Sequence, residues 1–176
     1  MKAIFGTLAA LLMMSSAHAQ NCISKIPAYQ ICADQGPLFS EAVAKSQREG
    51  KPLLVIFGAD WCPYCKNMDR LLSDSKIAAR VSAQLNWIEI AADKKTPAGA
   101  SADQIFRDLN EMAGDGKIEK IPGFPFLAFY NPVTKKVVWS DSEKFETDDD
   151  TQKKGVLHDP EIMIQTLSEA ARAVEN

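Results

Sequence analysis

The hydrophobic residues of this chain fall into segments of two spacings, which predict helices and strands in alternation. Apolar residues recur at helical spacing between Pro37 and a stop signal at Gly50, which predicts a helix. Residues 52–58 are continuously apolar and rich in branched or aromatic side chains, as is typical of a central strand buried on both faces. The segment after residue 62 returns to helical spacing, so a strand is expected to pass almost directly into a helix.

The rest of the chain continues this alternation. The expected elements after the first strand are a helix from residue 62 with an interruption around 73–75, a strand over 85–91, a helix that stops near 114–116, a strand from just after Pro125, a hairpin strand at the sheet edge over 136–140 and a last helix from Pro160. Residues 142–156 are polar and are expected to form a connection. This order predicts an α/β fold with a small mixed central sheet covered by helices on both faces.

The N-terminal residues have the pattern of a secretory signal peptide. Lys2 is followed by an apolar run over 3–14 and by a small-residue cleavage site that ends at Ala19. The apolar run is too short for a comfortable membrane span, so the processed protein is expected to have no stable membrane insertion. We therefore expect a signal peptide at 1–19, an irregular extension at 20–36 and one folded domain at 37–176, in a protein exported to the periplasm.

The charge of the chain limits its classes of partner. The formal net charge is −3, and no basic stripe of the kind that binds nucleic acid or an anionic membrane surface is present in the sequence. The apolar fraction of 46% is that of an ordinary globular protein. A nucleic-acid partner is therefore not expected.

The four cysteines form two local pairs, Cys22 with Cys32 and Cys62 with Cys65. An even number of cysteines in an exported chain indicates disulfides. Four thiols permit three pairings, and local pairing is the economical expectation among them. A Cys22–Cys32 disulfide would staple the N-terminal extension, and the alternative is a shuttle pair that exchanges with Cys62.

Cys62 and Cys65 lie where the first predicted strand passes into a helix. Two residues between the thiols allow both sulfurs to come from one helical turn, close enough to form a disulfide, and the unpaired N–H groups at a helix start stabilise a thiolate. A disulfide across so short a loop contributes little as a structural staple. The favoured chemistry is therefore thiol-disulfide exchange.

The chain resembles the thioredoxin superfamily from about residue 38 to residue 173, most specifically in Phe-Gly-Ala-Asp-Trp-Cys-Pro-Tyr-Cys-Lys at 57–66. The resemblance implies a thioredoxin fold in the domain at 37–176, preceded by the disulfide-stapled extension. A second motif, Gly-Phe-Pro at 123–125, stands where the family has a cis-proline at the start of the strand that faces the dithiol. Two motifs in the right order on the right elements carry the resemblance.

The resemblance also implies roles for individual residues. Cys62 would be the exposed attacking thiol and Cys65 the more buried resolving thiol. The backbone of Phe124 would pair with an extended substrate beside a cis Pro125. The expected apolar substrate-binding platform consists of Trp61, Pro63, Tyr64, Phe124 and Pro125.

The implied activity is that of a thiol-disulfide oxidoreductase acting on exported protein substrates, with the reducing direction favoured by the thioredoxin-like flanks. No cofactor is implied, and a membrane or periplasmic redox partner would recharge the dithiol. The alternatives are a disulfide isomerase, an oxidase, and a chaperone-like binding module in which the disulfide is not catalytic.

Two positions depart from the thioredoxin pattern. Thioredoxins carry a buried aspartate on the strand six positions before the first cysteine, where it assists proton transfer at the buried thiol, and this chain has Ile56 there. Either another carboxylate or a water molecule takes its place, or the exchange is less well tuned. Gly58 stands at a position that is usually aromatic in thioredoxin, which opens space beside the site.

Three other readings of the residues are disfavoured. A zinc site would need two further ligands, and the spacing of Cys22 and Cys32 is not that of a zinc finger, so no metal site is expected. A cysteine hydrolase would need a base, but the histidine left after signal removal, His158, lies in a polar segment and is expected at the surface. The acidic run at 148–150 lacks the glycine and the ligand pattern of a calcium loop and is expected to be solvated.

Overall fold

The computed structural model of the chain describes residues 29, 31–32, 34–146 and 158–175. The predicted signal peptide, most of the predicted extension and the acidic run at 148–150 lie outside these residues. Four strands form one mixed sheet in the order β2-β1-β3-β4. The strands are β1 (Leu53–Gly58), β2 (Asn86–Ala91), β3 (Phe126–Tyr130) and β4 (Val137–Asp141). β2 runs parallel to β1, whereas β3 and β4 are added as antiparallel strands.

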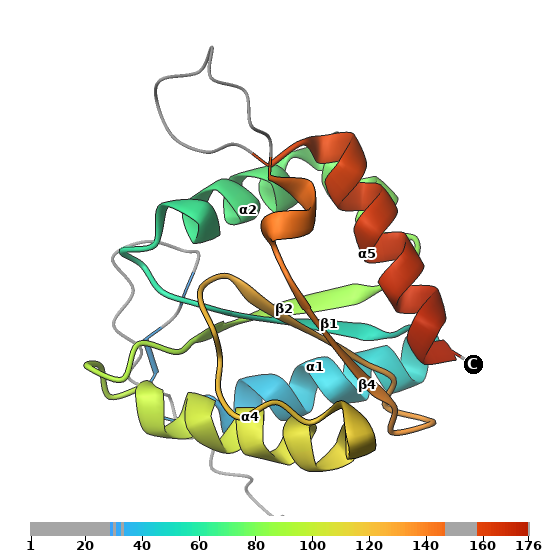
Figure 1. The fold of residues 1–176 in the computed structure, drawn as a ribbon. Helices are drawn as coiled ribbons and strands as arrows, with labels where there is room; N and C mark the ends of the chain where they lie inside the picture. The colour runs from blue at the N-terminus through green and yellow to red at the C-terminus, as the bar shows by residue number, and fades with distance from the viewer. Residues whose placement is uncertain (1–28, 30, 33, 147–157, 176) are drawn as a thin grey trace, which may run out of the picture.

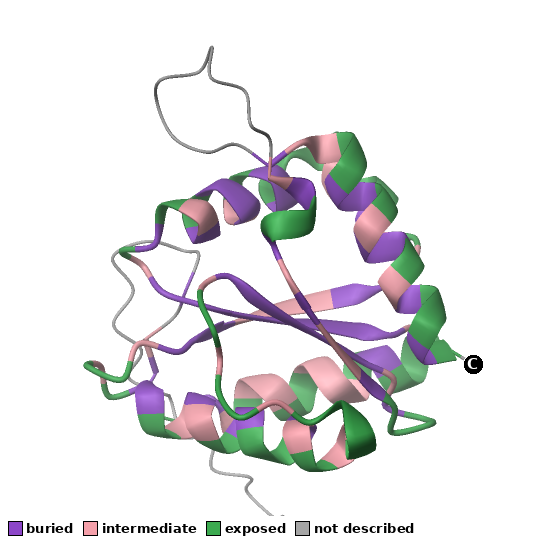
Figure 2. Cartoon of the chain, in the orientation of Figure 1, coloured by how far each residue is buried: buried purple, intermediate pink, exposed green. Residues whose placement is uncertain are grey.

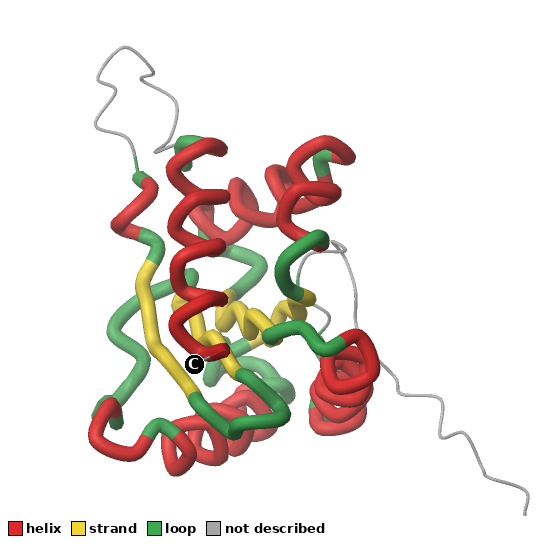
Figure 3. Tube along the Cα trace, turned by 90° about the vertical axis from the view of Figure 1, so that its right-hand side faces the viewer, coloured by secondary structure: helices red, strands yellow, loops and turns green. Residues whose placement is uncertain are grey.

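Helices cover both faces of the sheet (Figure 1), and the view in Figure 3 shows the strands between two helical layers. The helices are α1 (Gly36–Glu49), α2 (Pro63–Ser73), α3 (Ser75–Ser82), α4 (Gly99–Met112) and α5 (Pro160–Glu175), with short 3-10 turns η1 (Gly114–Gly116) and η2 (Glu143–Phe145). α2, α3 and α5 pack on one face, and α1 and α4 pack on the other. The predicted α/β fold with a small mixed sheet is confirmed.

Two apolar clusters divide at β1 because alternate side chains of a strand point to opposite faces. Leu54 and Ile56 face α2, α3 and α5, whereas Leu53, Val55 and Phe57 face α1 and α4. All six residues of β1 are buried, as Figure 2 shows for the centre of the sheet. The predicted central strand with two buried faces is therefore present.

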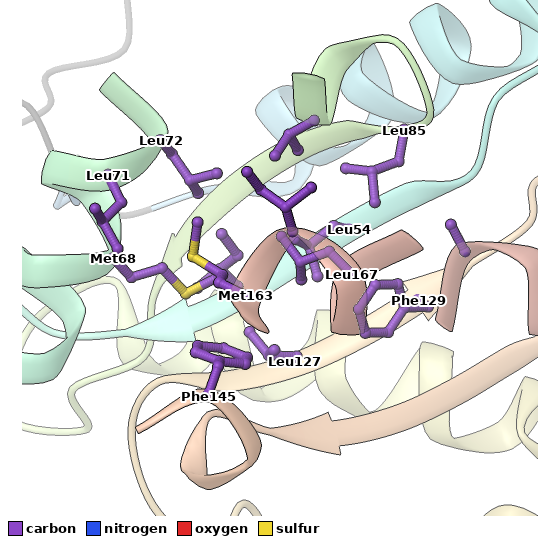
Figure 4. Packing of buried hydrophobic residues seen from close by; sticks show 14 of the residues in the cluster. Leu54, Met68, Leu71, Leu72, Leu85, Leu127, Phe129, Phe145, Met163 and Leu167 are labelled. Carbon is purple, nitrogen blue, oxygen red and sulfur yellow. The ribbon is translucent and has the colours of Figure 1, made fainter. Parts of the chain in front are cut away.

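The apolar cluster under α2 and α5 packs against β1, the strand that leads to Cys62 and Cys65. Met68 of α2 and Met163 of α5 lie next to each other in this cluster (Figure 4), which also contains Leu54 of β1 and Leu127 of β3. Phe145 of η2 closes one side of this cluster and has no exposed surface. The predicted polar connection at 142–156 therefore begins with an anchored aromatic residue, because an apolar side chain in a polar segment can still pack on a distant core.

The predicted interruption around 73–75 is the boundary between α2 and α3. The Asp74 carboxylate accepts hydrogen bonds from the backbone N–H groups of Lys76 (2.9 Å) and Ile77 (3.2 Å). These bonds satisfy donors that have no partner at a helix start, so a new helix begins at Ser75. The break separates α2, the helix that carries the cysteines, from α3, which precedes β2.

Candidate active site

The cysteine pair lies at the N-terminus of α2, directly after β1. Cys62 is the N-cap residue, with an extended backbone, and Pro63 occupies the first turn, where a missing N–H costs nothing. The backbone N–H of Cys65 donates a hydrogen bond to Cys62 Sγ over 3.1 Å. A helix N-terminal N–H in this position stabilises negative charge on the sulfur, as thiol-disulfide exchange requires.

Cys62 and Cys65 are joined by a disulfide, with their Cα atoms 5.3 Å apart. Cys62 is 2% exposed and Cys65 is 0% exposed. The expectation of an exposed Cys62 is therefore wrong for the oxidised state. Its sulfur is covered because the carbonyl oxygen of Phe124 lies 3.5 Å from Sγ and Tyr29 packs in the same buried cluster.

The segment before β3 brings a second part of the chain to the dithiol. The Phe124–Pro125 peptide bond is cis, and the ring of Phe124 lies 6.0 Å from the ring of Trp61, centroid to centroid. The carbonyl oxygen of Phe124 points to Cys62 rather than into the sheet. The residues expected around the dithiol from the two motifs are thus brought together, although they are far apart in the sequence.

Trp61 is the most exposed aromatic residue of the site, at 63%. Its indole Nε1 donates a hydrogen bond to Asp93 Oδ2 over 2.8 Å. The backbone N–H of Lys95 and this indole N–H, in that order, hold the pKa of Asp93 below its ordinary value. Asp93, a residue that the sequence patterns did not single out, therefore fixes the orientation of Trp61.

Two grooves flank the loop that carries Phe124. One groove has a volume of about 690 Å³ and is lined by Trp61, Phe106 and a mixture of basic and acidic side chains. The other has a volume of about 320 Å³ and runs past Tyr64 and Pro125 toward Asp141. Phe124 lines both grooves, so an extended chain that lies in either groove and passes the dithiol would contact this residue.

Tyr64, between the two cysteines, packs against His158 with ring centroids 6.2 Å apart. His158 is only 2% exposed and also meets Phe145 edge-on at 4.8 Å, so the expected surface position of this histidine is wrong. Burial between aromatic rings lowers the pKa of His158 to about 4. His158 therefore packs against Tyr64 as a neutral ring.

Two further residues near the site, Tyr29 and Glu89, were not found from the sequence patterns. Tyr29 fills the space that Gly58 leaves open. Glu89 lies on β2 in register with Ile56, and burial, with a smaller contribution from Asp69, raises its pKa to about 8. The one sequence signal for Glu89 was an acidic residue inside an otherwise apolar strand, and Tyr29 had no such signal.

The remaining predictions concern the other cysteines and metal binding. Cys32 is 1% exposed, but Cys22 lies outside the described residues, so the Cys22–Cys32 pairing stays a prediction. Within the part of the chain that the structure describes, no group of three or more histidine, cysteine or acidic residues is arranged to hold a metal ion. None of the described helices is both long and apolar enough to cross a bilayer.

The strand order, the helices on both faces and a Cys-X-X-Cys disulfide at the start of α2 define a thioredoxin-fold protein. A family model described as thioredoxin-like matches residues 37–132, more than half of the chain, and the chain belongs to this thioredoxin-like family. No curated protein sequence matches the chain.

Two solved structures are similar to this chain, and the first of them supports the fold. A disulphide isomerase from Xylella fastidiosa Temecula1 is similar over 87% of this chain and 98% of its own, with a TM-score of 0.52 and 18% identity. A thioredoxin from Thermus thermophilus covers 77% of this chain and 82% of its own, with a TM-score of 0.44 and 22% identity. The family and the Cys62–Cys65 disulfide together indicate thiol-disulfide chemistry.

Proposed function

We propose that this protein is an exported thiol-disulfide oxidoreductase that reduces disulfides in polypeptide substrates through Cys62 and Cys65. The observation that carries the proposal is the 3.1 Å hydrogen bond from the Cys65 N–H to Cys62 Sγ at the start of α2. This donor stabilises the Cys62 thiolate, which is both the attacking group and a good leaving group in exchange. The signal-peptide pattern at 1–19 supports export to the periplasm.

The reducing reaction begins with the reduced pair. The Cys62 thiolate attacks one sulfur of a substrate disulfide, and the other substrate sulfur leaves as a thiolate that takes up a proton. The Cys65 thiolate then attacks Cys62 Sγ, so that the substrate's second sulfur leaves and the observed disulfide forms. Two electrons pass to the substrate, and a membrane or periplasmic dithiol partner returns them to the protein.

Substrate binding is proposed at the grooves beside Phe124. In this proposal the substrate contacts an apolar platform of Trp61, Pro63, Tyr64, Phe124 and Pro125, which is supported by the contacts of Phe124 with Trp61 and Cys62. Cys62 keeps a small exposed area whereas Cys65 has none, which favours Cys62 as the sulfur that partners reach. An extended substrate segment that displaces the contact between Phe124 and Cys62 would gain access to Sγ.

Reduction of insulin by a dithiol reductant, followed by turbidity, tests this function. Wild-type protein is expected to accelerate the reaction, and Cys62→Ser is expected to abolish the acceleration. Cys65→Ser is expected to accumulate a mixed disulfide through Cys62, visible by mass spectrometry. Equal rates for the wild type and both variants would contradict the enzymatic function.

The reduction potential of the Cys62–Cys65 pair, measured against glutathione, tests the direction. A value near that of thioredoxin, about −270 mV, supports a reductase, whereas a value near about −120 mV supports an oxidase. The second candidate, a binding module with a structural disulfide, is favoured by the burial of both sulfurs beside the exposed Trp61. Substrate binding that persists unchanged in Cys62→Ser, without any reduction by the wild type, would support it.

A further inference from the structure

A group of ionisable side chains around Tyr29, which shares a buried cluster with Cys62 and Cys65, has no part in the exchange steps described so far. Glu89 pairs in parallel register with Ile56, and side chains at paired positions of neighbouring strands point to the same face. Ile56 belongs to the cluster under α2 that contains Met68. Glu89 therefore lies on the α2 side of the sheet, and α2 is the helix that carries Cys65.

Tyr29 connects this carboxyl group with the cysteines. It has no exposed surface, and it shares one buried cluster with Cys62 and Cys65. Its hydroxyl has no hydrogen-bond partner among the described residues, which is unusual for a buried hydroxyl. Besides burial, the negative charges of Glu89, Asp69 and Asp60 raise the pKa of Tyr29, so the hydroxyl lies within electrostatic reach of Glu89.

We infer that Glu89 is the proton acceptor for Cys65 and that the Tyr29 hydroxyl relays the proton between them. The inference rests on the proposed function and adds a residue pair to it. When Cys65 attacks the mixed disulfide, its S–H bond breaks, Tyr29 accepts that proton and passes its own to the Glu89 carboxylate. The Cys65–Cys62 bond forms as the Cys62–substrate bond breaks, and the departing substrate thiolate takes a proton from solvent.

The proton affinity of Glu89 suits this role. Burial, with a contribution from the charge of Asp69 on α2, raises the pKa of Glu89 to about 8. Glu89 is therefore a much better acceptor for a thiol proton than a solvated glutamate, whose ordinary pKa is about 4.5. Asp60, before the dithiol, and Asp69 are the other carboxyl groups that act on this cluster. Thioredoxins carry a carboxyl group on the strand at the position of Ile56. In this chain the carboxyl group of Glu89, on the neighbouring strand β2, lies beside that position.

The first experiment measures the second exchange step alone. Cys62 is converted to a mixed disulfide with a chromophoric aromatic thiol, and release of the thiol by Cys65 is followed by stopped flow across neutral and alkaline pH. The wild-type rate is expected to rise through about pH 8 and then level off. Glu89→Gln and Tyr29→Phe are each expected to be slowed about tenfold or more, and Glu89→Gln is expected to lose the inflection.

The matched control is Glu169→Gln, which makes the same chemical change at an exposed position of α5 and is expected to leave rate and pH profile unchanged. A Glu89→Gln profile identical to the wild-type profile would overturn the inference.

The second experiment needs neither a variant nor catalytic activity. The carboxyl carbon of Glu89 is titrated by NMR in the oxidised and the reduced wild-type protein. We expect a titration near pH 8 that changes on reduction, because the carboxyl and the Cys65 thiol then share a proton and titrate together. Superimposable titrations in the two states would overturn the proton-acceptor role even if the protein reduces insulin. Absence of insulin reduction with a redox-dependent Glu89 titration would instead contradict only the proposed function.

Discussion

A Cβ atom placed on Gly58 would lie 2.5 Å from the Tyr29 hydroxyl oxygen and from Cζ of the same ring. Gly58 is the last residue of β1, and Tyr29 belongs to the segment before α1. The aromatic ring missing from the strand is therefore supplied by a distant part of the chain. Tyr29 also shares a buried cluster with Cys62 and Cys65, so this residue is part of the site.

Gly58→Ala is expected to destabilise the fold by about 1–3 kcal/mol, because a methyl group would overlap a fully buried ring. The loss is measured by denaturant unfolding. In a Tyr29→Ala background, the same substitution is expected to cost less, since the ring is gone. Gly116→Ala is the control, because a Cβ there meets nothing within 4 Å. Equal costs for Gly58→Ala in the two backgrounds would refute the contact.

Glu89 predicts a pH dependence of stability. Its pKa in the folded protein is about 8, above the ordinary value of 4.5, so the folded state holds a proton that the unfolded state has lost at intermediate pH. The stability associated with this group is fully present below about pH 4.5 and is lost as the pH rises through 8. Glu89→Gln should therefore be more stable than the wild type at alkaline pH, by on the order of 3 kcal/mol.

Unfolding curves of the wild type, Glu89→Gln and Glu169→Gln at acidic and alkaline pH test this difference. Glu169 is exposed on α5, so its variant should follow the wild-type pH dependence. A Glu89→Gln stability that runs parallel to the wild type at all pH values would show that the carboxyl is solvated rather than buried.

His158 predicts the opposite dependence at acidic pH. Burial lowers its pKa to about 4 from the ordinary 6.5, so the unfolded state binds the proton first. The stability associated with neutral His158 is complete above about pH 6.5 and is lost as the pH falls through 4. His158→Phe should remove up to about 3 kcal/mol of this acid sensitivity while keeping a ring against Tyr64. Thermal unfolding across acidic pH measures the effect. If His158→Phe loses stability at acidic pH as steeply as the wild type, the prediction is wrong.

The hydrogen bond between Trp61 and Asp93 predicts an effect on substrate binding. Trp61→Phe keeps an aromatic ring but removes the indole N–H that Asp93 accepts. Losing this exposed bond should raise KM for a polypeptide substrate a few fold, with little change in kcat or in stability, because the ring is positioned less firmly. Asp93→Ala should have the same effect, and the double variant should be no worse than either single one. Additive increases in KM would mean that the two residues act independently.

The local architecture of the site could be predicted from the sequence because it depends on neighbours along the chain. The apolar run at 52–58 followed by Cys-Pro-Tyr-Cys predicted a strand that leads into a helix start, and the structure has Cys62 as the N-cap of α2. The interruption of the following helix was also predictable, since Asp74 is a strong capping residue. Each of these features needs only a few consecutive residues to form.

Burial and proton affinity at the site could not be predicted in the same way. The resemblance to thioredoxins implied an exposed Cys62, and the polar sequence around His158 indicated a surface position, yet both residues are buried, because Phe124 and Phe145 come from other elements. In the sequence, Glu89 has no evident partner. The parallel pairing of β1 with β2 brings it beside Ile56. A desolvated carboxyl acquires its raised pKa from its surroundings, which are not adjacent in the chain.

The sequence by itself determined the thioredoxin-like order of elements and the position of the dithiol, since periodicity, capping and the two-residue spacing act over a single turn or strand. Only the tertiary structure decided which groups surround that dithiol. Tertiary packing brings the ring of Tyr29 against Gly58 and the carboxyl of Glu89 beside Ile56. It also places the neutral imidazole of His158 against Tyr64. Packing over long sequence separations sets the local dielectric environment, and that environment sets the chemistry of ionisable groups.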